Sequence, residues 1–411
     1  MSNAGHQKAR ADGSAYGRPL AHPDCELTQV GPGTPCGELM RRYWQPVGLS
    51  SQLTHRPASV QILGEDLILF RNKKGRPGLL YPRCMHRGTN LFYGKVTEQG
   101  IACCYHGWEF DTEGRCLLQS CEPGGGRNRA VARQPWYPVQ ERYGMVFAYM
   151  GPPKRKPLLP CYDILEDLGP DEELRVDAGG FGATLDHSLK ILPYSWLQMN
   201  DNAMDPFHVH VLHSTFSVVQ FVPEFALMPT VDFFTTPSGV CYSAKRKLQD
   251  GREYERISSW LLPNILCIPN TFDIGPAKAS RIRWILPVDD SHFTMFTVSR
   301  MPRSAPPLES MRIKGKLWSE MTDEERQDTP SDYEAQAGQG RISLHSEEHL
   351  ASTDRGIIMQ RRMLRAQIRV VADGGDPIGI TFDQNEVLVS VRSGNIYKTP
   401  SVVGGDRNGP R

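Results

Sequence analysis

Two short clusters of cysteine and histidine, between residues 84 and 106, constrain this chain more than any other feature. The first is Cys84-Met85-His86 and the second is Cys103-Cys104-Tyr105-His106. Thiolates and imidazoles so close in sequence can reach one metal centre from loop tips, as in a structural zinc site or an iron–sulfur cluster. Zinc sites typically pair like ligands, as C-x2-C or H-x3-5-H. Here each loop offers one cysteine and one histidine, which is expected if one iron is held by both cysteines and another by both histidines.

The bulk composition is that of an ordinary globular protein in a reducing compartment. Ten cysteines in 411 residues are too few for a disulfide scaffold, and their clustering near histidines also indicates metal. The first residues have no apolar core and are not expected to be a signal peptide, which predicts a cytoplasmic location. The formal charge of +1 gives no field that would attract nucleic acid or an anionic membrane. The apolar runs are too short to span a bilayer.

The residue pattern predicts an α+β protein of four segments. Short apolar runs punctuated by turns are typical of an antiparallel all-β domain, which we expect to end at the breaker Gly151-Pro152-Pro153. Strand-like runs followed by a long helix then predict an α+β domain. The expected segments are a flexible tail over 1–24, a helical segment over 25–45 that packs on the second domain, the β domain over 46–153 and the α+β domain over 154–411.

Within these segments, periodicity predicts the main elements. A short helix is expected over 34–45, and further helices at about 194–213 and 353–372. Strands are expected between 229 and 300, and a polar segment spans 303–345.

A second cluster, NDNAMDPFHVHVLH over residues 200–213, holds three histidines and two aspartates. Non-haem iron oxygenases bind Fe(II) with two histidines and one carboxylate on one face of the metal. On a regular helix five residues turn about 500°, so His208 and His213 diverge unless the helix breaks between them. Local geometry alone favours His210 with His213, and a helix with a polar face is the alternative.

Both clusters resemble the motifs of one family, the Rieske non-haem iron oxygenases. C-x-H-x16-C-x2-H followed by Gly107-Trp108 resembles the Rieske [2Fe–2S] motif. This resemblance implies as cluster ligands Cys84, His86, Cys103 and His106. Cys104 stands where the family usually has proline, and we expect it to pack as a small apolar group.

The second cluster resembles the family's mononuclear-iron signature, N-x2-D-x2-H-x4-H. This resemblance implies His208 and His213 as iron ligands, against the local geometry, with Asn202 close to them. Asp205 is then expected to join His208 to the cluster histidine His106 of a neighbouring subunit and so to carry electrons between the metals.

The third iron ligand is expected to be a carboxylate far along the chain. Ser352-Thr353-Asp354-Arg355-Gly356 resembles the segment where the phthalate-type subgroup has its ligand, so Asp354 is the predicted third ligand. An acid in the first turn of a helix is also favoured by the helix dipole. The rival carboxylates are Asp332, Glu347 and Glu348.

The resemblance extends over nearly the whole chain and implies a function. Val30-Gly31-Pro32-Gly33 and Leu39-Met40-Arg41-Arg42-Tyr43-Trp44 look like the start of the phthalate and phenoxybenzoate subgroup. The second domain would then have a helix-grip fold, an antiparallel sheet around a long helix. The subunits would form a homotrimer or a hexamer built from trimers.

The implied protein is a terminal oxygenase that uses O2, the [2Fe–2S] cluster and mononuclear Fe(II) to hydroxylate an aromatic carboxylate, such as a phthalate or a phenoxybenzoate. No G-x-G-x-x-G follows a predicted strand, so a separate NADH-dependent reductase with flavin and an iron–sulfur centre would supply the electrons. The alternatives are angular dioxygenation that cleaves a diaryl ether, an aromatic O-demethylase and a Rieske electron carrier. An electron carrier needs no open iron site, so the second cluster argues against it.

The substrate pocket is expected to be lined by the apolar run 258–272 and the strand 240–248. A cation facing an apolar pocket would suit an aromatic carboxylate, although a solvated end of the basic run 245–247 is the alternative. The candidate substrate-binding residues are His210, Arg246, Trp260, Asn264 and Phe272.

Overall fold

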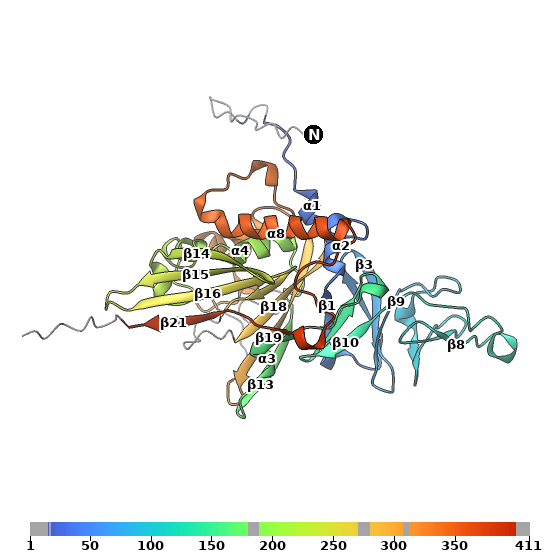
Figure 1. The fold of residues 1–411 in the computed structure, drawn as a ribbon. Helices are drawn as coiled ribbons and strands as arrows, with labels where there is room; N and C mark the ends of the chain where they lie inside the picture. The colour runs from blue at the N-terminus through green and yellow to red at the C-terminus, as the bar shows by residue number, and fades with distance from the viewer. Residues whose placement is uncertain (1–14, 16–17, 180–188, 270–279, 307–311, 400–411) are drawn as a thin grey trace, which may run out of the picture.

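The computed structural model describes residues 15, 18–179, 189–269, 280–306 and 312–399 (Figure 1). A β region and a larger α+β region lie side by side, as the sequence predicts. No helix in the described part of the chain is long and apolar enough to cross a membrane.

The β region is built from three small antiparallel sheets. The outermost, at the far end of the molecule in Figure 1, consists of β5 (Lys95–Val96), β6 (Gly100–Ala102), β7 (Glu109–Asp111) and β8 (Cys116–Leu118). The next contains β2 (Ala58–Ile62), β3 (Glu65–Arg71), β4 (Pro77–Leu80) and β9 (Trp136–Tyr137). The third contains β1 (Trp44–Leu49), β10 (Val139–Arg142) and β11 (Met145–Tyr149).

The helical segment before β1 ends sooner than predicted. Thr34 accepts a hydrogen bond from the Gly37 amide and starts α2 (Pro35–Arg41). The helix predicted over 34–45 then stops, because Trp44 and the residues after it pair with β11. A preceding short helix, α1 (Cys25–Thr28), is held on the α+β region by ion pairs of Arg365 with Asp24 and Glu26.

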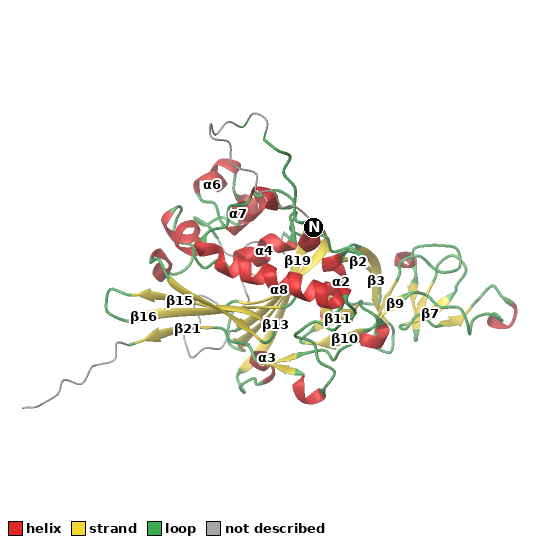
Figure 2. Cartoon of the chain, turned by 45° about the horizontal axis from the view of Figure 1, so that its top comes forward, coloured by secondary structure: helices red, strands yellow, loops and turns green. Residues whose placement is uncertain are grey.

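The α+β region is an antiparallel sheet that packs against helices (Figures 1 and 2). Its strands, in spatial order, are β13 (Glu172–Ala178), β19 (His292–Pro302), β18 (Arg281–Asp289), β17 (Ile265–Cys267), β16 (Glu253–Leu261), β15 (Gly239–Lys247) and β14 (Thr230–Thr236). A last strand, β21 (Gly394–Lys398), pairs with β16. The predicted strands between 229 and 300 are therefore confirmed.

Two helices cover the sheet: α4 (Trp196–Ala203) and the long α8 (Arg355–Ala372), which lie alongside each other over it (Figure 2). The helix predicted at 353–372 is confirmed, and its buried apolar face includes Ile357, Leu364 and Ile368. The polar segment 303–345, for which no helix was expected, contains α6 (Asp323–Asp328) and α7 (Asp332–Ala337). A small parallel pair, β12 (Cys161–Tyr162) with β20 (Leu388–Val389), and the helix α3 (Asp163–Glu166) complete the main elements.

Candidate metal centres

The two Cys–His segments form a matched pair of tight loops beside the β5–β8 sheet. In the first, the Gly88 amide donates to the Cys84 carbonyl (2.7 Å), and in the second the Gly107 amide donates to the Cys103 carbonyl (2.9 Å). Both glycines have positive φ, +77° and +67°, which L side chains rarely adopt. Each loop therefore turns back directly behind its cysteine and presents its histidine at the tip.

The four side chains of these loops separate into an inner and an outer pair. Cys84 and Cys103 are buried, whereas His86 and His106 are partly exposed, with ring centroids 4.6 Å apart. Burial, with a contribution from Cys103, raises the pKa of the Cys84 thiol to about 11. The buried Nδ1 of His86 has no hydrogen-bond partner in the described part of the chain. Two thiols within and two imidazoles facing outward fit a [2Fe–2S] cluster with one iron on each pair.

Cys104 does not pack as an apolar group, as the sequence analysis expected. It lies at the loop tip and is exposed, because the turn that buries Cys103 directs the next residue outward.

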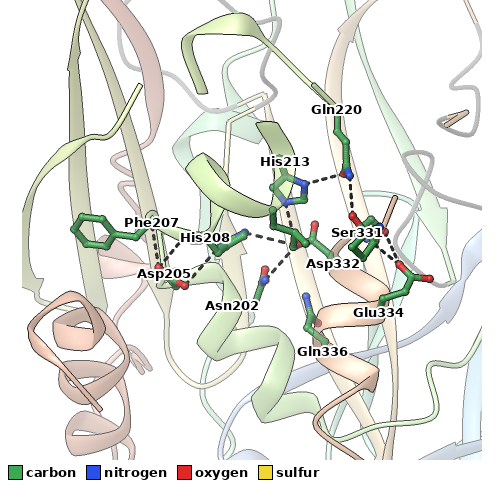
Figure 3. Close-up of polar contacts among 12 residues, drawn as sticks. Asn202, Asp205, Phe207, His208, His213, Gln220, Ser331, Asp332, Glu334 and Gln336 are labelled. Atoms are coloured by element: carbon green, nitrogen blue, oxygen red, sulfur yellow. Dashed lines mark hydrogen bonds and ion pairs between the residues drawn. The ribbon is translucent and has the colours of Figure 1, made fainter. Parts of the chain in front are cut away.

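A second group of ligand atoms lies in the α+β region. Among the described residues, His208, His213 and Asp332 each offer one ligand atom, and these atoms lie within 4.8 Å of one another (Figure 3). The Asp332 Oδ1 lies 3.5 Å from the Nε2 of His208 and 3.2 Å from the Nε2 of His213. Two imidazoles and one carboxylate converging on one point are the ligand set of a non-haem Fe(II) site with open positions.

A change of helix type brings the two histidines together. The helix predicted over 194–213 stops at Ala203, and after Asp205 and Pro206 a short turn, α5 (His208–His210), leads into a π-helical turn over Val211–Thr215. A π turn closes through i→i+5 hydrogen bonds, here from the Phe216 amide to the Val211 carbonyl (2.8 Å). The wider turn leaves the rings of His208 and His213 with centroids 5.3 Å apart, although five residues separate them.

The outer faces of the three ligand side chains are held by further polar groups (Figure 3). Gln220 Oε1 lies 2.8 Å from the Nδ1 of His213, which directs Nε2 of that ring toward Asp332. Asn202 donates to Asp332 Oδ1 at 3.1 Å, and Asp205 Oδ2 lies 3.6 Å from the Nδ1 of His208.

Electrostatics also favour a cation here. Burial alone would lower the pKa of His208, but hydrogen bonding to Asp205 and Asp332 raises it to about 10. Two carboxylates that stabilise positive charge so strongly in a buried pocket make a site suited to a divalent metal.

Asp354, the predicted third ligand, is not part of this group. It stands at the start of α8, where its carboxylate accepts a hydrogen bond from the Ala351 amide (2.6 Å). Gly356, two residues after Asp354, gives this segment a packing role instead. A Cβ at Gly356 would meet the Met204 carbonyl oxygen at 2.3 Å, so the segment packs α8 closely against the end of α4. Asp332, named only as a rival, takes the position beside the histidines.

A sequence signal for Asp332 was present. Ser331-Asp332-Tyr333-Glu334 has the S-x-x-E pattern of a capping box, which marks the start of a helix. In the structure Glu334 accepts from the Ser331 amide at 2.9 Å and Asp332 is the first residue of α7. The pattern locates the helix, but it does not show that α7 reaches the histidines.

The predicted substrate residues fall in different surroundings. Trp260 and Asn264 are buried and bonded: the Trp260 indole donates to Asn200 (2.9 Å), and Asn264 donates to Gln45 (3.0 Å). Arg246 is also buried, with its guanidinium 5.2 Å from the Phe225 ring centroid.

The last two of the predicted substrate residues are His210 and Phe272. His210 lies outside the group of three ligands, and its Nδ1 is buried without a hydrogen-bond partner in the described part of the chain. Phe272 lies outside the described residues.

Comparisons with known proteins identify the family of the chain. Residues 43–132 match the Rieske [2Fe-2S] domain family. The chain is 55% identical over 394 residues to the phenoxybenzoate dioxygenase subunit alpha of Ectopseudomonas oleovorans, covering 95% of this chain and 96% of that relative. It is 33% identical over 380 residues to the 5,5'-dehydrodivanillate O-demethylase oxygenase subunit of Sphingobium sp. (strain NBRC 103272 / SYK-6), covering 88% and 84% of the two chains.

A solved structure shares the fold. It is that of NdmA from Pseudomonas putida CBB5 with caffeine, which aligns with a TM-score of 0.57 at 17% identity over 86% of this chain and 99% of that one. With the match to the Rieske domain and the identity to a dioxygenase alpha subunit over nearly the full length, the chain belongs to the Rieske non-haem iron oxygenases, as the alpha subunit of a terminal oxygenase.

Proposed function

We propose that this oxygenase hydroxylates an aromatic carboxylate at an Fe(II) held by His208, His213 and Asp332. The observation that carries the proposal is the convergence of these three ligand atoms within 4.8 Å, with His213 and Asp332 already oriented by hydrogen bonds. Three protein ligands leave coordination positions free, and a bound Fe(II) would supply the reductive activation of O2 there.

The surrounding residues have separate tasks in this proposal. Gln220 accepts the Nδ1 proton of His213, so that Nε2 is free to bind the metal. Asn202 orients Asp332 through one carboxylate oxygen. Asp205 lies 3.6 Å from the Nδ1 of His208, and its own side chain remains 26% exposed. Asp205 can therefore accept a second hydrogen bond from outside the chain.

We propose that this outside partner is His106 of a neighbouring copy in a homotrimer. Cys84, His86, Cys103 and His106 would hold the [2Fe–2S] cluster, and the partly exposed histidines would be its electron exit. Apolar side chains are exposed near both proposed contact surfaces, as a subunit contact requires. On the cluster loops and beside them these are Met85, Phe92, Tyr93 and Tyr105, and at the proposed iron histidines they are Val211, between the two, and Phe216 and Val219 after them.

Electrons would come from a separate NADH-dependent reductase with a flavin and an iron–sulfur centre. We place this system in the cytoplasm, since all ten cysteines of the chain are described and each is a free thiol.

The substrate class follows from the relatives and from the charge of the site region. An aromatic carboxylate with a diaryl ether fits the relative that is 55% identical, so we propose a phenoxybenzoate-like acid and dioxygenation next to the ether. O-demethylation of a methoxylated aromatic acid is the second candidate, favoured by the relative that is 33% identical.

The test is turnover of the reconstituted system with 18O2. The purified oxygenase, with a surrogate reductase and NADH, is given 3-phenoxybenzoate or a methoxybenzoate. Two labelled oxygens in a product of the phenoxy acid support dioxygenation, whereas formaldehyde release from the methoxy acid supports demethylation. Full occupancy of both metal centres without coupled product from either acid would contradict the proposed function.

A further inference from the structure

One face of the catalytic sheet gathers arginine side chains. In an antiparallel sheet, directly paired residues share a face and alternate residues along a strand share it too. Trp260 and Arg256 of β16 are therefore on one face, Leu266 of β17 pairs with Trp260, and Arg283 of β18 pairs with Leu266. On the other side of β16, Ala244 pairs with Arg256, which places Arg246 on the same face.

This face is the one that α4 covers. The Trp260 indole donates to Asn200 of α4, and two residues further along the same helix Asn202 donates to Asp332. Two side chains of α4, only two residues apart, thus contact the arginine-bearing face and a proposed iron ligand.

Positive charge on this face is only partly balanced: Asp177 of β13 and Arg283 both pair with Thr297 of β19, so that carboxylate lies on the same face. The acidic residues of β16, Glu253 and Glu255, pair with Lys247 and Lys245 and so lie on the opposite face. Neither β15 nor β17 contains a carboxylate. An anionic ligand would therefore enter a cationic surrounding.

Arg281, two residues before Arg283 on β18, lies on this face too, and two further arginines there are already engaged. Arg256 donates to the Asn395 side chain and to the Pro269 carbonyl, both at 2.8 Å. Arg246 donates through Nε to the Leu227 carbonyl (2.9 Å), its Nη1 is buried without a partner among the described residues, and only 1% of its surface is exposed.

Arg283 differs from both. Its side chain makes no hydrogen bond or ion pair with any residue that the structure describes, and its Nε is buried without a partner. The residue is nevertheless partly exposed, so part of the guanidinium is open to solvent. Burial lowers the pKa of Arg283 to about 9, and the charge of Asp332 is among those that act to raise it. A desolvated guanidinium that makes no ion pair with any described residue gains most from binding an anion.

We propose that Arg283 binds the carboxylate of the substrate and so orients the aromatic ring toward His208, His213 and Asp332. This inference rests on the proposed function. The planar guanidinium can donate two parallel hydrogen bonds to a carboxylate, which fixes direction as well as position.

The test compares one acid and its uncharged analogue. The oxidised holoenzyme, which does not turn over, is titrated calorimetrically with 3-phenoxybenzoate and with 3-phenoxybenzyl alcohol. We expect Arg283→Gln to weaken binding of the acid about 10- to 100-fold and to change binding of the alcohol less than about twofold. Arg283→Lys keeps the positive charge but not the planar, two-pronged guanidinium. Its affinity for the acid should lie between those of the wild-type enzyme and Arg283→Gln. Arg252→Gln removes an exposed arginine from the turn between β15 and β16 and should change neither.

The outcomes separate the two proposals. Suppose that the wild-type enzyme binds and oxidises the acid. If Arg283→Gln then keeps its affinity for the acid, or loses affinity for acid and alcohol alike, the proposed role of Arg283 is overturned and the proposed function stands. If the wild-type enzyme, with both metal centres filled, neither binds nor oxidises any aromatic acid, both are overturned. The visible Rieske spectrum and the iron content of each variant verify that it is folded.

Discussion

Asp332 and Asp354 are identical carboxylates at the start of two helices, and only their surroundings give them different chemistry. Asp332 accepts from Asn202 and approaches two imidazoles, whereas Asp354 accepts a backbone amide of its own turn. We expect Asp332→Ala to lose mononuclear iron and product formation, with the Rieske spectrum retained. Asp354→Ala should keep its iron and lose at most about 1 kcal/mol of stability as a helix-start residue. Iron analysis of the two purified variants decides between them, and iron loss in Asp354→Ala alone would restore that residue as the ligand.

Much of the site could be predicted from residue types and spacing, since cysteines and histidines so close in sequence leave few other uses. Asp332 could not be assigned in this way, because it lies 119 positions from His213 and the fold alone joins them. The same applies to Arg283, whose side chain bonds to no residue that the structure describes because of how the sheet packs.

The two adjacent cysteines of the second Cys–His loop allow a matched pair of variants. Cys103 is buried beside Cys84, and Cys104 is exposed. Cys103→Ser or Cys84→Ser should abolish the visible Rieske absorbance, because serine is a poor ligand for iron in a cluster, whereas Cys104→Ser should leave it. Absorbance spectra of the purified variants test this, and a colourless Cys104→Ser protein would require a different ligand set.

Gln220 links two ligand segments, because its oxygen contacts His213 Nδ1 and its amide nitrogen donates to the Pro330 carbonyl (2.9 Å) beside α7. Gln220→Leu removes both contacts, and we expect iron affinity to fall about 10- to 100-fold. Gln220→Glu keeps an oxygen acceptor and should lose less. Competition with a chelator measures the affinity, with the Rieske absorbance as an internal reference, and equal affinities of wild-type and Gln220→Leu protein would refute the role.

At the scale of elements, strands and the long helix were predictable because each carries its apolar residues at a regular period. The iron segment was not, since a π turn follows from hydrogen bonds that no periodicity reveals. The helices α6 and α7 were missed because they are short and polar, with only their capping residues as a signal.

The contact between α8 and the end of α4 depends on the absence of a side chain at Gly356. An added Cβ would meet the Met204 carbonyl oxygen at 2.3 Å and Phe233 Cε1 at 2.5 Å. Gly356→Ala should therefore destabilise the protein by about 1–3 kcal/mol and loosen the turn that leads to Asp205. Gly31→Ala, where nothing lies within 4 Å, should change stability by less than about 0.5 kcal/mol. Thermal unfolding of both variants makes the comparison, and equal melting temperatures would refute the packing argument.

At the scale of the whole molecule, the β5–β8 sheet and the loops beside it lie at the end of the β region, away from the α+β region with α4 and α8 (Figure 1). In the described part of one chain, His106 and Asp205 share no hydrogen bond or ion pair, which agrees with a route between subunits. Asp205→Asn keeps the shape of the side chain but removes its charge. We expect both metal centres to survive and electron transfer between them to slow about 10- to 100-fold. Single-turnover oxidation of the reduced cluster measures this rate, and an unchanged rate would contradict the role of Asp205.

A route between subunits also predicts complementation. Chains with Cys84→Ser lack the cluster and chains with His213→Ala lack the iron, so each alone should be inactive. Co-assembled trimers should regain a measurable fraction of activity, because an intact cluster then faces an intact iron on its neighbour. Mixed trimers that form but remain inactive would place the electron path within one chain.

The pairing of β21 with β16 sets the order in which the protein can be completed during synthesis. Along one edge of β16, Ser259–Leu261 pair with the nearby β17, but Glu253–Ile257 wait for Gly394–Lys398. Until the ribosome has made Gly394–Lys398, this part of the edge is open and able to pair with another nascent chain. Asn395 of β21 is also the residue that holds Arg256. The arginine-bearing face of the sheet is thus finished only when β21 has been translated, and a product that stops before Gly394 would leave it incomplete.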